Sequence, residues 1–331
     1  MSFVIIWTLF LGLSATAIPL AFAIGLTPLL FFYLSGKYEP VVIFQSLVGV
    51  NESFSLLALP FFVLAGELMS VGGIGKRITS FAFALVGWIP GGLALMSVLA
   101  SMIFGGVSGS AAADAAAVGG VMIPAMIKKG YDRAYAAAVI ASAGTIGVII
   151  PPSIPMVLYA FVSGVSLGDL FMAGVVPGIL VGLALMACAF VIAVRRRYPT
   201  ESVINSRELA RSFLDCVPAL LAPVIILGSI FSGIVTPTEA AVIAVLYAVL
   251  VGRYVYRDLA WRDIPRILVR TGEMTAVMML IIGAGDALSW ALTAENFSTI
   301  FSHWIVSLTS SKVVILVLIN IFLLILGGPM P

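Results

Sequence analysis

The sequence predicts an all-α polytopic membrane protein. Hydrophobic residues make up 62% of its 331 positions and charged residues only 10%, whereas a soluble domain carries about 25% charged residues. Mean hydropathy is +1.20, and several uncharged stretches reach the roughly 20 residues that a helix needs to cross a bilayer. Because so few charges cannot cover a surface in water, most of the surface is expected to face the lipid bilayer. This excludes a soluble enzyme domain, and the net charge of +2 gives no reason to expect a nucleic-acid partner.

The first 36 residues carry no charge. No basic segment precedes them, and no small-residue cleavage site is followed by a polar segment, so they are predicted to stay in the membrane and not to be a signal peptide. The two cysteines, Cys188 and Cys216, have no CxxC partner and lie at or near apolar segments. This pattern favours packing in the core over a disulfide or a metal site.

Clusters of basic residues separate the apolar stretches and are predicted to be cytoplasmic, because Lys and Arg accumulate on that side of a membrane. The clusters lie at 76–77, 128–133, 195–211 and 253–270. The stretches 78–127, 134–194 and 216–252 therefore each leave the cytoplasm and return to it. The second is expected to turn near 163–169 and the third near 232–238.

The centre of the stretch 78–127 consists of small residues. It reads Gly105-Gly106-Val107-Ser108-Gly109-Ser110 and continues with alanines around Asp114. Such residues suit the tip of a re-entrant hairpin packed inside protein, because backbone polar groups exposed to lipid cost several kcal/mol each. A hairpin over about 89–127 is favoured over the alternative of two ordinary spans joined by an external Gly-rich turn.

A broken helix is expected over about 134–165. It contains Gly144-Thr145-Ile146-Gly147 and then Pro151-Pro152-Ser153-Ile154-Pro155. A proline lacks the backbone donor and clashes with the preceding turn, so this segment cannot form a continuous helix. The break exposes carbonyl groups and the N-terminus of a half-helix at membrane depth. A further span is expected over 170–194.

The two halves of the chain share a weak repeat. Three landmarks recur at separations of 218, 219 and 222 residues: Pro19 with Pro237, Ala65-Gly66-Glu67 with Ala284-Gly285-Asp286, and Gly105-Gly106 with Gly327-Gly328. We predict a first repeat over 1–198, a cytoplasmic linker over 199–215, and an incomplete second repeat over 216–331. The basic clusters give the two copies opposite orientations, which is the architecture of inverted-repeat secondary transporters with broken helices.

An amphipathic helix is predicted between the two last apolar stretches. Apolar residues recur there at helical spacing, at Phe297, Ile300, Phe301, Trp304, Ile305 and Leu308. Such a helix is expected to lie in the outer membrane interface.

Six stretches along the chain carry the motifs of a known family. They lie at 64–69, 106–115, 123–126, 130–132, 147–155 and 236–241. In these motifs the whole chain resembles the large membrane subunit of tripartite ATP-independent periplasmic (TRAP) transporters. The resemblance implies a secondary transporter fold of the ion-transporter-superfamily type, and an importer that couples sodium to carboxylate-bearing solutes by an elevator motion. It also implies two partners, a small membrane subunit and a periplasmic substrate-binding protein, and a location in the bacterial or archaeal cytoplasmic (inner) membrane.

The hairpin tip and the helix break are the candidate binding site. Sodium is the expected coupling ion, with no other cofactor, and it requires several oxygen ligands, which unwound backbone and hydroxyl groups can provide. The candidate sodium ligands are Ser108, Ser110, Thr145 and Gly147. An anionic solute favours the N–H groups of half-helix N-termini. The candidate solute contacts are Ser110, Ala111, Pro152 and Ser153. Asp114, one turn beyond the tip, is expected to support ion binding.

These residues also have structural interpretations. Small hydroxyl residues can join membrane helices, Ser153 can cap the second half-helix, and Asp114 can cap a helix or pair. Glu67, Glu239 and Asp286 lie near segment ends, where interfacial or packing roles are expected.

Two intramembrane protease patterns are weaker alternatives, and the chain is not expected to be an enzyme. Gly106-Val107-Ser108-Gly109 matches the GxSG pattern of rhomboid proteases, but a serine nucleophile needs a base. The sole histidine, His303, lies on the predicted outer helix. Asp286 and Asp132 imitate a paired-aspartate motif, but Asp132 lies in a predicted cytoplasmic loop.

Another sodium-coupled carboxylate carrier and a fragment without transport activity remain as alternatives. No P-loop is present, which argues against a nucleotide-driven pump. Family members continue beyond the second hairpin tip, so the repeat predicts that about 90 residues are missing after Pro331 and that the chain as written does not transport.

Overall fold

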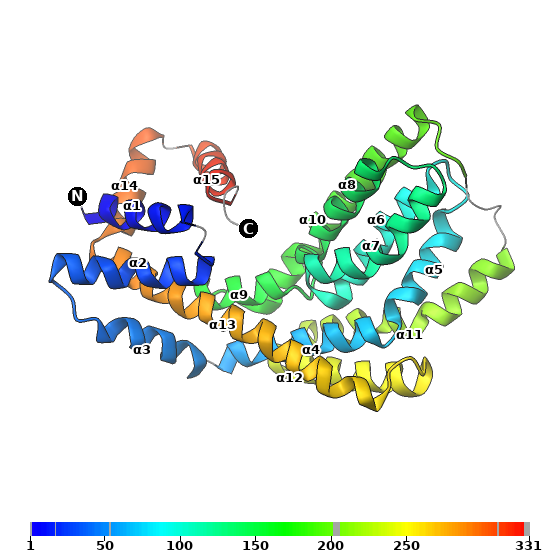
Figure 1. Cartoon of the computed structure of the whole chain (residues 1–331), viewed down its shortest axis with the longest axis horizontal. Helices are drawn as coiled ribbons and strands as arrows, with labels where there is room; N and C mark the ends of the chain where they lie inside the picture. The colour runs from blue at the N-terminus through cyan, green and yellow to red at the C-terminus, as the bar shows by residue number, and fades with distance from the viewer. Residues whose placement is uncertain (1, 17, 53, 201–205, 310, 328–331) are drawn as a thin grey trace. The chain divides into compact units, whose positions relative to one another are not determined.

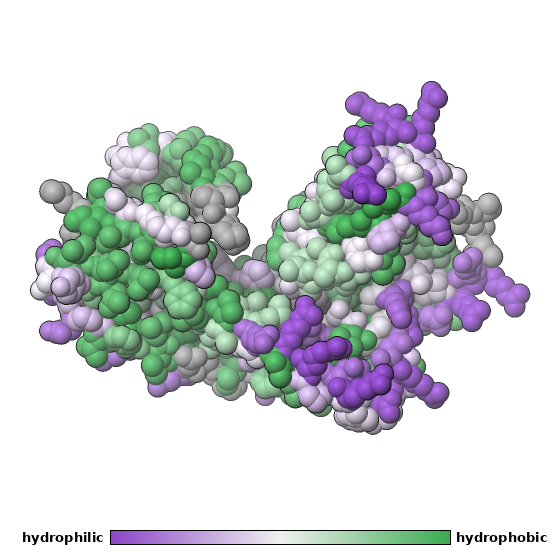
Figure 2. Space-filling view, in the orientation of Figure 1, coloured by the Kyte–Doolittle hydropathy of each residue, from purple (hydrophilic) through white to green (hydrophobic). Residues whose placement is uncertain are grey.

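A computed structural model describes residues 2–16, 18–52, 54–200, 206–309 and 311–327 (Figure 1). The described residues form helices and contain no strand, which confirms the predicted all-α class. Five helices are long and apolar enough to cross a membrane, or up to six if a bent pair counts as one span. The polytopic prediction is therefore confirmed by length and composition. Figure 2 shows hydrophobic residues over α2 and α3, whereas hydrophilic residues gather around the ends of α10 and α12.

Contacts divide the chain into two units that do not coincide with the predicted repeats. Unit 1 comprises 1–53 and 276–331, and unit 2 comprises 54–275. The long helix α13 (Ile264–Ala294) contributes to both units. The repeats were predicted as consecutive stretches, whereas packing joins the first segment of the chain to the last.

Unit 1 contains the N-terminal helices and the last part of the chain. Its elements are α1 (Ser2–Ala15), α2 (Leu20–Ser35), α3 (Val41–Gly49), the short 3-10 helix η1 (Val50–Glu52), the second part of α13, α14 (Phe297–Leu308) and α15 (Lys312–Gly327). Helix α1 ends before Pro19 and α2 begins directly after it, and the bounds of the amphipathic helix α14 agree with the prediction. Its core consists of Ile6, Phe31, Phe32, Ile43, Ala287 and Ala291.

A polar contact joins the loop after α2 to the end of α13. Lys37 Nζ lies 3.3 Å from Glu295 Oε1, and the Tyr38 hydroxyl donates to the same oxygen at 3.0 Å. The positive-inside assignment predicts that both loops lie outside, and this sidedness stays a prediction.

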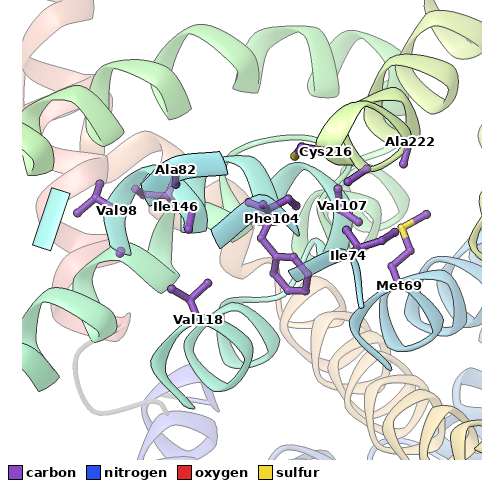
Figure 3. Close-up of a cluster of buried hydrophobic side chains, with 14 of the residues drawn as sticks. Met69, Ile74, Ala82, Val98, Phe104, Val107, Val118, Ile146, Cys216 and Ala222 are labelled. Carbon is purple, nitrogen blue, oxygen red and sulfur yellow. The ribbon is translucent and has the colours of Figure 1, made fainter. Parts of the chain in front are cut away.

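Unit 2 contains the predicted hairpin and the predicted broken helix. Its elements are η2 (Phe54–Leu57), α4 (Ala58–Val71), α5 (Ile74–Val86), α6 (Gly92–Ser108), α7 (Ala111–Lys128), α8 (Arg133–Gly144), the 3-10 turn η3 (Thr145–Val148), α9 (Ile154–Ser163), α10 (Leu167–Arg195), α11 (Ser206–Phe231), α12 (Pro237–Leu250), the π-helical turn η4 (Val251–Val255), η5 (Trp261–Asp263) and the first part of α13. The turns between α9 and α10 and between α11 and α12 fall where the sequence predicts them. Figure 3 shows the core that α4, α5, α6, α7, η3 and α11 share, with Met69, Ile74, Phe104, Val118, Ile146 and Cys216 among its side chains.

The bend between α4 and α5 was not predicted. The two helices meet at 63° after Gly72 and Gly73. Gly73 has a φ of +80°, and a Cβ there would collide with the Asp258 carboxylate and the Arg77 guanidinium. These two side chains form an ion pair, and Arg77 also lies 4.2 Å from the centre of the Tyr256 ring. The bend is therefore held by a glycine and a charge pair that join two predicted cytoplasmic segments.

Helices α6 and α7 form a hairpin whose two open ends contact the end of α10. The N–H of Gly91, just before α6, donates to the Pro199 carbonyl at 3.4 Å. Beyond α7, the Tyr131 ring stacks on the Tyr198 ring with centroids 4.1 Å apart, and the Asp132 N–H donates to the Tyr198 hydroxyl at 3.3 Å. Both ends of the hairpin thus lie on one side of the unit, as a re-entrant hairpin requires. Its position in a membrane stays a prediction.

Three other expectations differ from the structure or fall outside it. Helix α11 begins at Ser206, inside the predicted linker 199–215, because charged residues such as Arg207 and Glu208 continue a helix beyond its apolar part. Cys216 is buried as expected, but Cys188 is exposed. Most of the predicted second hairpin tip, at 328–331, lies outside the described residues.

The starts of two pairs of helices can be compared with the predicted repeat, which itself stays a prediction. Helix α2 begins at Leu20 and α12 at Pro237, whereas α6 begins at Gly92 and α15 at Lys312. The opposite orientation of the two copies stays a prediction.

A buried carboxylate between a hairpin tip and a helix break

The hairpin tip is a tight turn between two helices. Helix α6 ends at Ser108, and Gly109 follows with a φ of +64°. Ser110 is the N-cap of α7, and its hydroxyl accepts the Ala113 N–H at 3.4 Å. Serine at this position satisfies one of the N–H groups that a helix start leaves without an acceptor.

The helix break lies directly against this tip. After the turn η3, Pro151 and Pro152 interrupt the helix, and Ser153 caps α9 by accepting the Met156 N–H at 3.5 Å. The Ile154 N–H donates to the Gly109 carbonyl at 3.1 Å. A Cβ on Gly109 would lie 2.6 Å from the Pro152 carbonyl oxygen, so only glycine fits between the tip and the break. The sequence prediction that these two features adjoin one another therefore agrees with the structure.

Asp114 is fully buried behind the tip. Its Oδ1 accepts a short hydrogen bond from the Ser108 hydroxyl, which in turn accepts the Ser110 N–H at 3.2 Å. Its Oδ2 has no hydrogen-bond partner among the described residues. A carboxylate out of water needs a compensating charge or donors, and within the described part of the chain no ion pair reaches Asp114.

Two glycines form the niche around the Asp114 Oδ2 atom. A Cβ on Gly147 would collide with this oxygen, and a Cβ on Gly105 would lie 3.0 Å from it and 2.6 Å from Gly147 Cα. Because neither residue has a side chain, α6 and η3 approach closely with the carboxylate at their contact. An ion at Oδ2 would also lie beside the irregular backbone of η3, which offers carbonyl oxygens.

The predicted sodium ligands do not all meet at this niche. Ser108 and Gly147 lie against Asp114, and Ser110 lies at the tip. Thr145 is exposed, and its hydroxyl donates to the Ser142 carbonyl at 2.7 Å. Among the described residues, no hydrogen bond joins Thr145 to Ser108 or Asp114. Its role as a ligand stays a prediction.

The two half-helix N-termini differ in their free donors. In α9 the donors are used, because Ile154 bonds to Gly109, Pro155 has no N–H, and Met156 and Val157 bond to Ser153. In α7 the first two N–H groups, of Ala111 and Ala112, have no acceptor in the part of the chain that the structure describes.

The predicted solute contacts therefore separate into two groups. Ser110 and Ala111 are partly exposed at the open N-terminus of α7. Pro152 and Ser153 are buried, and the Ser153 hydroxyl donates to the Val148 carbonyl at 2.7 Å. The N-cap interpretation of Ser153 is thus confirmed, and its role in binding a solute stays a prediction.

Three glycines at the site were not among the predicted site residues. One is Gly105. A Cβ on Gly66 of α4 would lie 3.0 Å from the Ser108 carbonyl oxygen, and a Cβ on Gly144 of α8 would lie 3.0 Å from the Ala111 carbonyl oxygen. A glycine inside an otherwise apolar helix often marks a close backbone approach, which is the signal that could have identified them.

The hydrogen bonds do not match the protease patterns. The Ser108 hydroxyl donates to a carboxylate and not to a histidine. Asp132 is the N-cap of α8, where it accepts the Tyr135 N–H at 2.9 Å, and it lies 3.9 Å from Arg196. Neither residue has the partners of a protease nucleophile or acid.

Comparisons with known proteins agree with the motifs. The family model described as "Tripartite ATP-independent periplasmic transporter, DctM component" matches residues 7–331. The chain is 41% identical over 304 residues to the C4-dicarboxylate TRAP transporter large permease protein DctM of Pseudomonas aeruginosa. The matched region covers 92% of this chain and 70% of that protein.

Two other relatives have similar identity and different named solutes. The sialic acid TRAP transporter large permease protein SiaM of Vibrio cholerae is 38% identical, over 96% of this chain and 74% of its own length. The isethionate TRAP transporter permease protein DctMQ of Oleidesulfovibrio alaskensis is 37% identical, over 94% of this chain and 49% of its own length.

Proposed function

The chain belongs to the DctM component family of tripartite ATP-independent periplasmic transporters, and on that premise we propose that it couples sodium to the import of a small carboxylate-bearing solute. It is a TRAP-type large permease and a multi-pass membrane protein, not a member of an enzyme family. The proposed location is the cytoplasmic (inner) membrane. The proposed partners are a small membrane subunit and a periplasmic substrate-binding protein.

One observation carries the sodium proposal. Asp114 is buried, accepts one hydrogen bond from Ser108, and presents Oδ2 to a niche between Gly105 and Gly147. A monovalent cation there would neutralise the charge and gain carbonyl oxygens from the broken helix, as the ions of secondary transporters do at unwound backbone. Ser108, Ser110, Thr145 and Gly147 are the proposed ligands, with Asp114 supporting the ion through its charge.

The solute proposal rests on the open N-terminus of α7. The N–H groups of Ala111 and Ala112 and the Ser110 hydroxyl can bind one carboxylate, which the helix dipole also favours. Isethionate is a sulfonate, whereas sialic acid and C4-dicarboxylates carry carboxylates, and relatives named for all three have similar identity to this chain. A small organic anion is therefore the wider class, and a carboxylate is the specific proposal.

The transport mechanism is proposed to be an elevator motion. The hairpin and the broken helix would move together, because a hydrogen bond from the Ile154 N–H to the Gly109 carbonyl joins them at the tip. Solute and ion would be carried between the two sides with this pair of elements, and the small membrane subunit would remain with the stationary helices.

Sodium binding can be tested on the purified chain itself. Thermal unfolding is measured in NaCl and in choline chloride at equal ionic strength, for the wild type, Asp114→Asn and Ser108→Ala, with Asp169→Asn as a control at an exposed carboxylate. Sodium should stabilise the wild type and the control, and both site variants should lose most of this shift. An equal sodium shift in all four proteins would remove Asp114 and Ser108 from the ion site.

Solute class is tested by uptake into proteoliposomes that contain the permease and its small membrane subunit, with the binding protein outside. An inward sodium gradient should drive uptake of a labelled C4-dicarboxylate. Uptake of isethionate alone would replace the carboxylate proposal by a sulfonate one, and uptake that is independent of sodium would contradict the coupling.

A further inference from the structure

Helix α4 contacts the hairpin tip through a glycine, although it belongs neither to the hairpin nor to the broken helix. Gly66 and Ser108 are both buried. A Cβ on Gly66 would lie 3.0 Å from the Ser108 carbonyl oxygen and 3.4 Å from the Ser108 Cα. The backbones of α4 and α6 therefore touch at this point, which a small residue in a membrane helix allows.

The position of Gly66 is set by helices other than the hairpin pair. A Cβ on Gly72, at the end of α4, would lie 3.1 Å from the Cα of Gly252 in the turn that follows α12. Glu67 is buried, and its Oε1 lies 3.4 Å from Nε of Arg270 in α13. One backbone contact and one ion pair thus anchor α4 to α12 and to the first part of α13.

The residue that Gly66 contacts is also the one that orients the buried carboxylate. Ser108 donates its hydroxyl to Asp114 Oδ1 and accepts the Ser110 N–H at 3.2 Å. It is the last residue of α6, so no further helical turn holds its carbonyl in place. A shift of the Ser108 backbone would move its hydroxyl, and the carboxylate that accepts from it would move as well.

We infer that Gly66 of α4 is a positioning residue of the sodium site, so that sodium binds tightly only while the hairpin tip rests on α4. The inference rests on the proposed function, because it assumes that the ion lies at Asp114 and Ser108. It adds a third element to the site and links the affinity for the ion to one arrangement of the hairpin and α4. When the tip leaves α4, Ser108 loses its support and the ion is released more easily.

The first test measures the sodium midpoint of the purified chain. Thermal unfolding is followed as NaCl replaces choline chloride at constant ionic strength, for the wild type and Gly66→Ala. The new Cβ would displace the Ser108 carbonyl by a few tenths of an ångström. Because a displacement of about 1 Å can cost about a hundredfold, we expect the midpoint to rise about three- to tenfold.

The matched control is Gly228→Ala in α11, where nothing lies within 4 Å of a Cβ. Its sodium midpoint should equal that of the wild type. A purely structural role of Gly66 would lower the unfolding temperature of Gly66→Ala by the same amount at every sodium concentration. An unchanged midpoint in this variant would therefore overturn the inference.

A second measurement uses the wild type and needs no substitution at Gly66. Hydrogen–deuterium exchange is compared in NaCl and in choline chloride over 62–69 of α4, with 4–15 of α1 as the control segment. An ion that holds Ser108 also holds its contact with Gly66, so sodium should slow exchange at 62–69 and leave 4–15 unchanged. Ser108→Ala should abolish this difference.

The outcomes separate this inference from the proposed function. If sodium neither stabilises the wild type nor slows its exchange, the proposed sodium site fails as well. If sodium stabilises the wild type and slows exchange at the hairpin tip but not at 62–69, only the role of α4 fails. If Gly66→Ala does not fold, the exchange measurement on the wild type decides alone.

Discussion

The substitution Gly147→Ala tests the geometry of the niche directly. The new Cβ would collide with Asp114 Oδ2 and lie 2.8 Å from Asp114 Cγ and 3.4 Å from Gly105 Cα. The helix α6 limits movement on one side and the turn η3 on the other, so the carboxylate has to move. It would then lose its hydrogen bond from the Ser108 hydroxyl.

The size of the effect follows from these two changes. Overpacking a filled interior costs about 1–3 kcal/mol, and a buried acceptor that loses its donor costs about 1–3 kcal/mol more. The same movement of the Asp114 carboxylate relieves the collision and breaks the hydrogen bond, so the two costs do not add fully. We expect the free energy of unfolding to fall by about 2–4 kcal/mol. Gly120→Ala is the matched control, because Gly120 lies in α7 with nothing within 4 Å of a Cβ. Replacing glycine by alanine inside a helix should stabilise the protein by about 0.5–1 kcal/mol.

The assay is thermal unfolding of the detergent-solubilised chain, followed by tryptophan fluorescence, in NaCl and in choline chloride. A ligand at ten times its dissociation constant stabilises the folded state by about 1.4 kcal/mol. That sodium-dependent part should disappear in Gly147→Ala and persist in Gly120→Ala. The reasoning would be refuted if Gly147→Ala unfolded within about 0.5 kcal/mol of the wild type and kept its full response to sodium.

Three further predictions address other parts of the molecule. Ser153→Ala removes the cap of α9 and should lower stability by about 1 kcal/mol; an altered sodium midpoint would assign Ser153 to the ion site instead. Burial raises the pKa of Tyr256 from 10.0 to about 12, so the neutral phenol stabilises the fold fully below pH 10.0 and this stability is lost as pH rises through about 12. Tyr256→Phe should remove that alkaline loss in pH-dependent unfolding, and an unchanged profile would show that another group causes it. Cysteines at Val165 and Thr236 should react with impermeant thiol reagents from outside whereas one at Lys128 should not, and equal labelling of all three would contradict the sidedness.

The fold class and the place of the candidate site could be predicted from local sequence features. Consecutive prolines at 151 and 152 favour the end of a helix, because two adjacent residues lack the backbone donor, and Gly109 between two serines favours a tight turn. The basic clusters separated stretches whose turns fall at the predicted positions. Each of these signals depends only on a few neighbouring residues, so it can be recognised without knowing the tertiary contacts.

The contacts between distant segments could not be predicted in the same way. The bend at Gly73 depends on Asp258 and Arg77, which lie far apart in the chain. The niche depends on the close approach of Gly105 to Gly147. A glycine can occur in an apolar helix for several reasons, so the sequence does not identify this approach. Thr145 was predicted as a ligand from its place beside the break, but the direction of its hydroxyl depends on the helical turn that places the Ser142 carbonyl within reach.

The different hydrogen bonding of the two half-helices determines how an anion can bind between them. A carboxylate that approached α9 would have to displace the bond from the Ile154 N–H to the Gly109 carbonyl and the Ser153 cap, each with a net contribution of about 1 kcal/mol. At α7 it would meet the N–H groups of Ala111 and Ala112 with no such bond to replace. The anion should therefore bind mainly to α7, and α9 should hold the tip in place. Because Asp114 lies in the first turn of α7, a cation at its Oδ2 would also reduce the repulsion between this carboxylate and the bound anion. Ion and solute binding would then be linked through one helix turn, without any movement of the second half-helix.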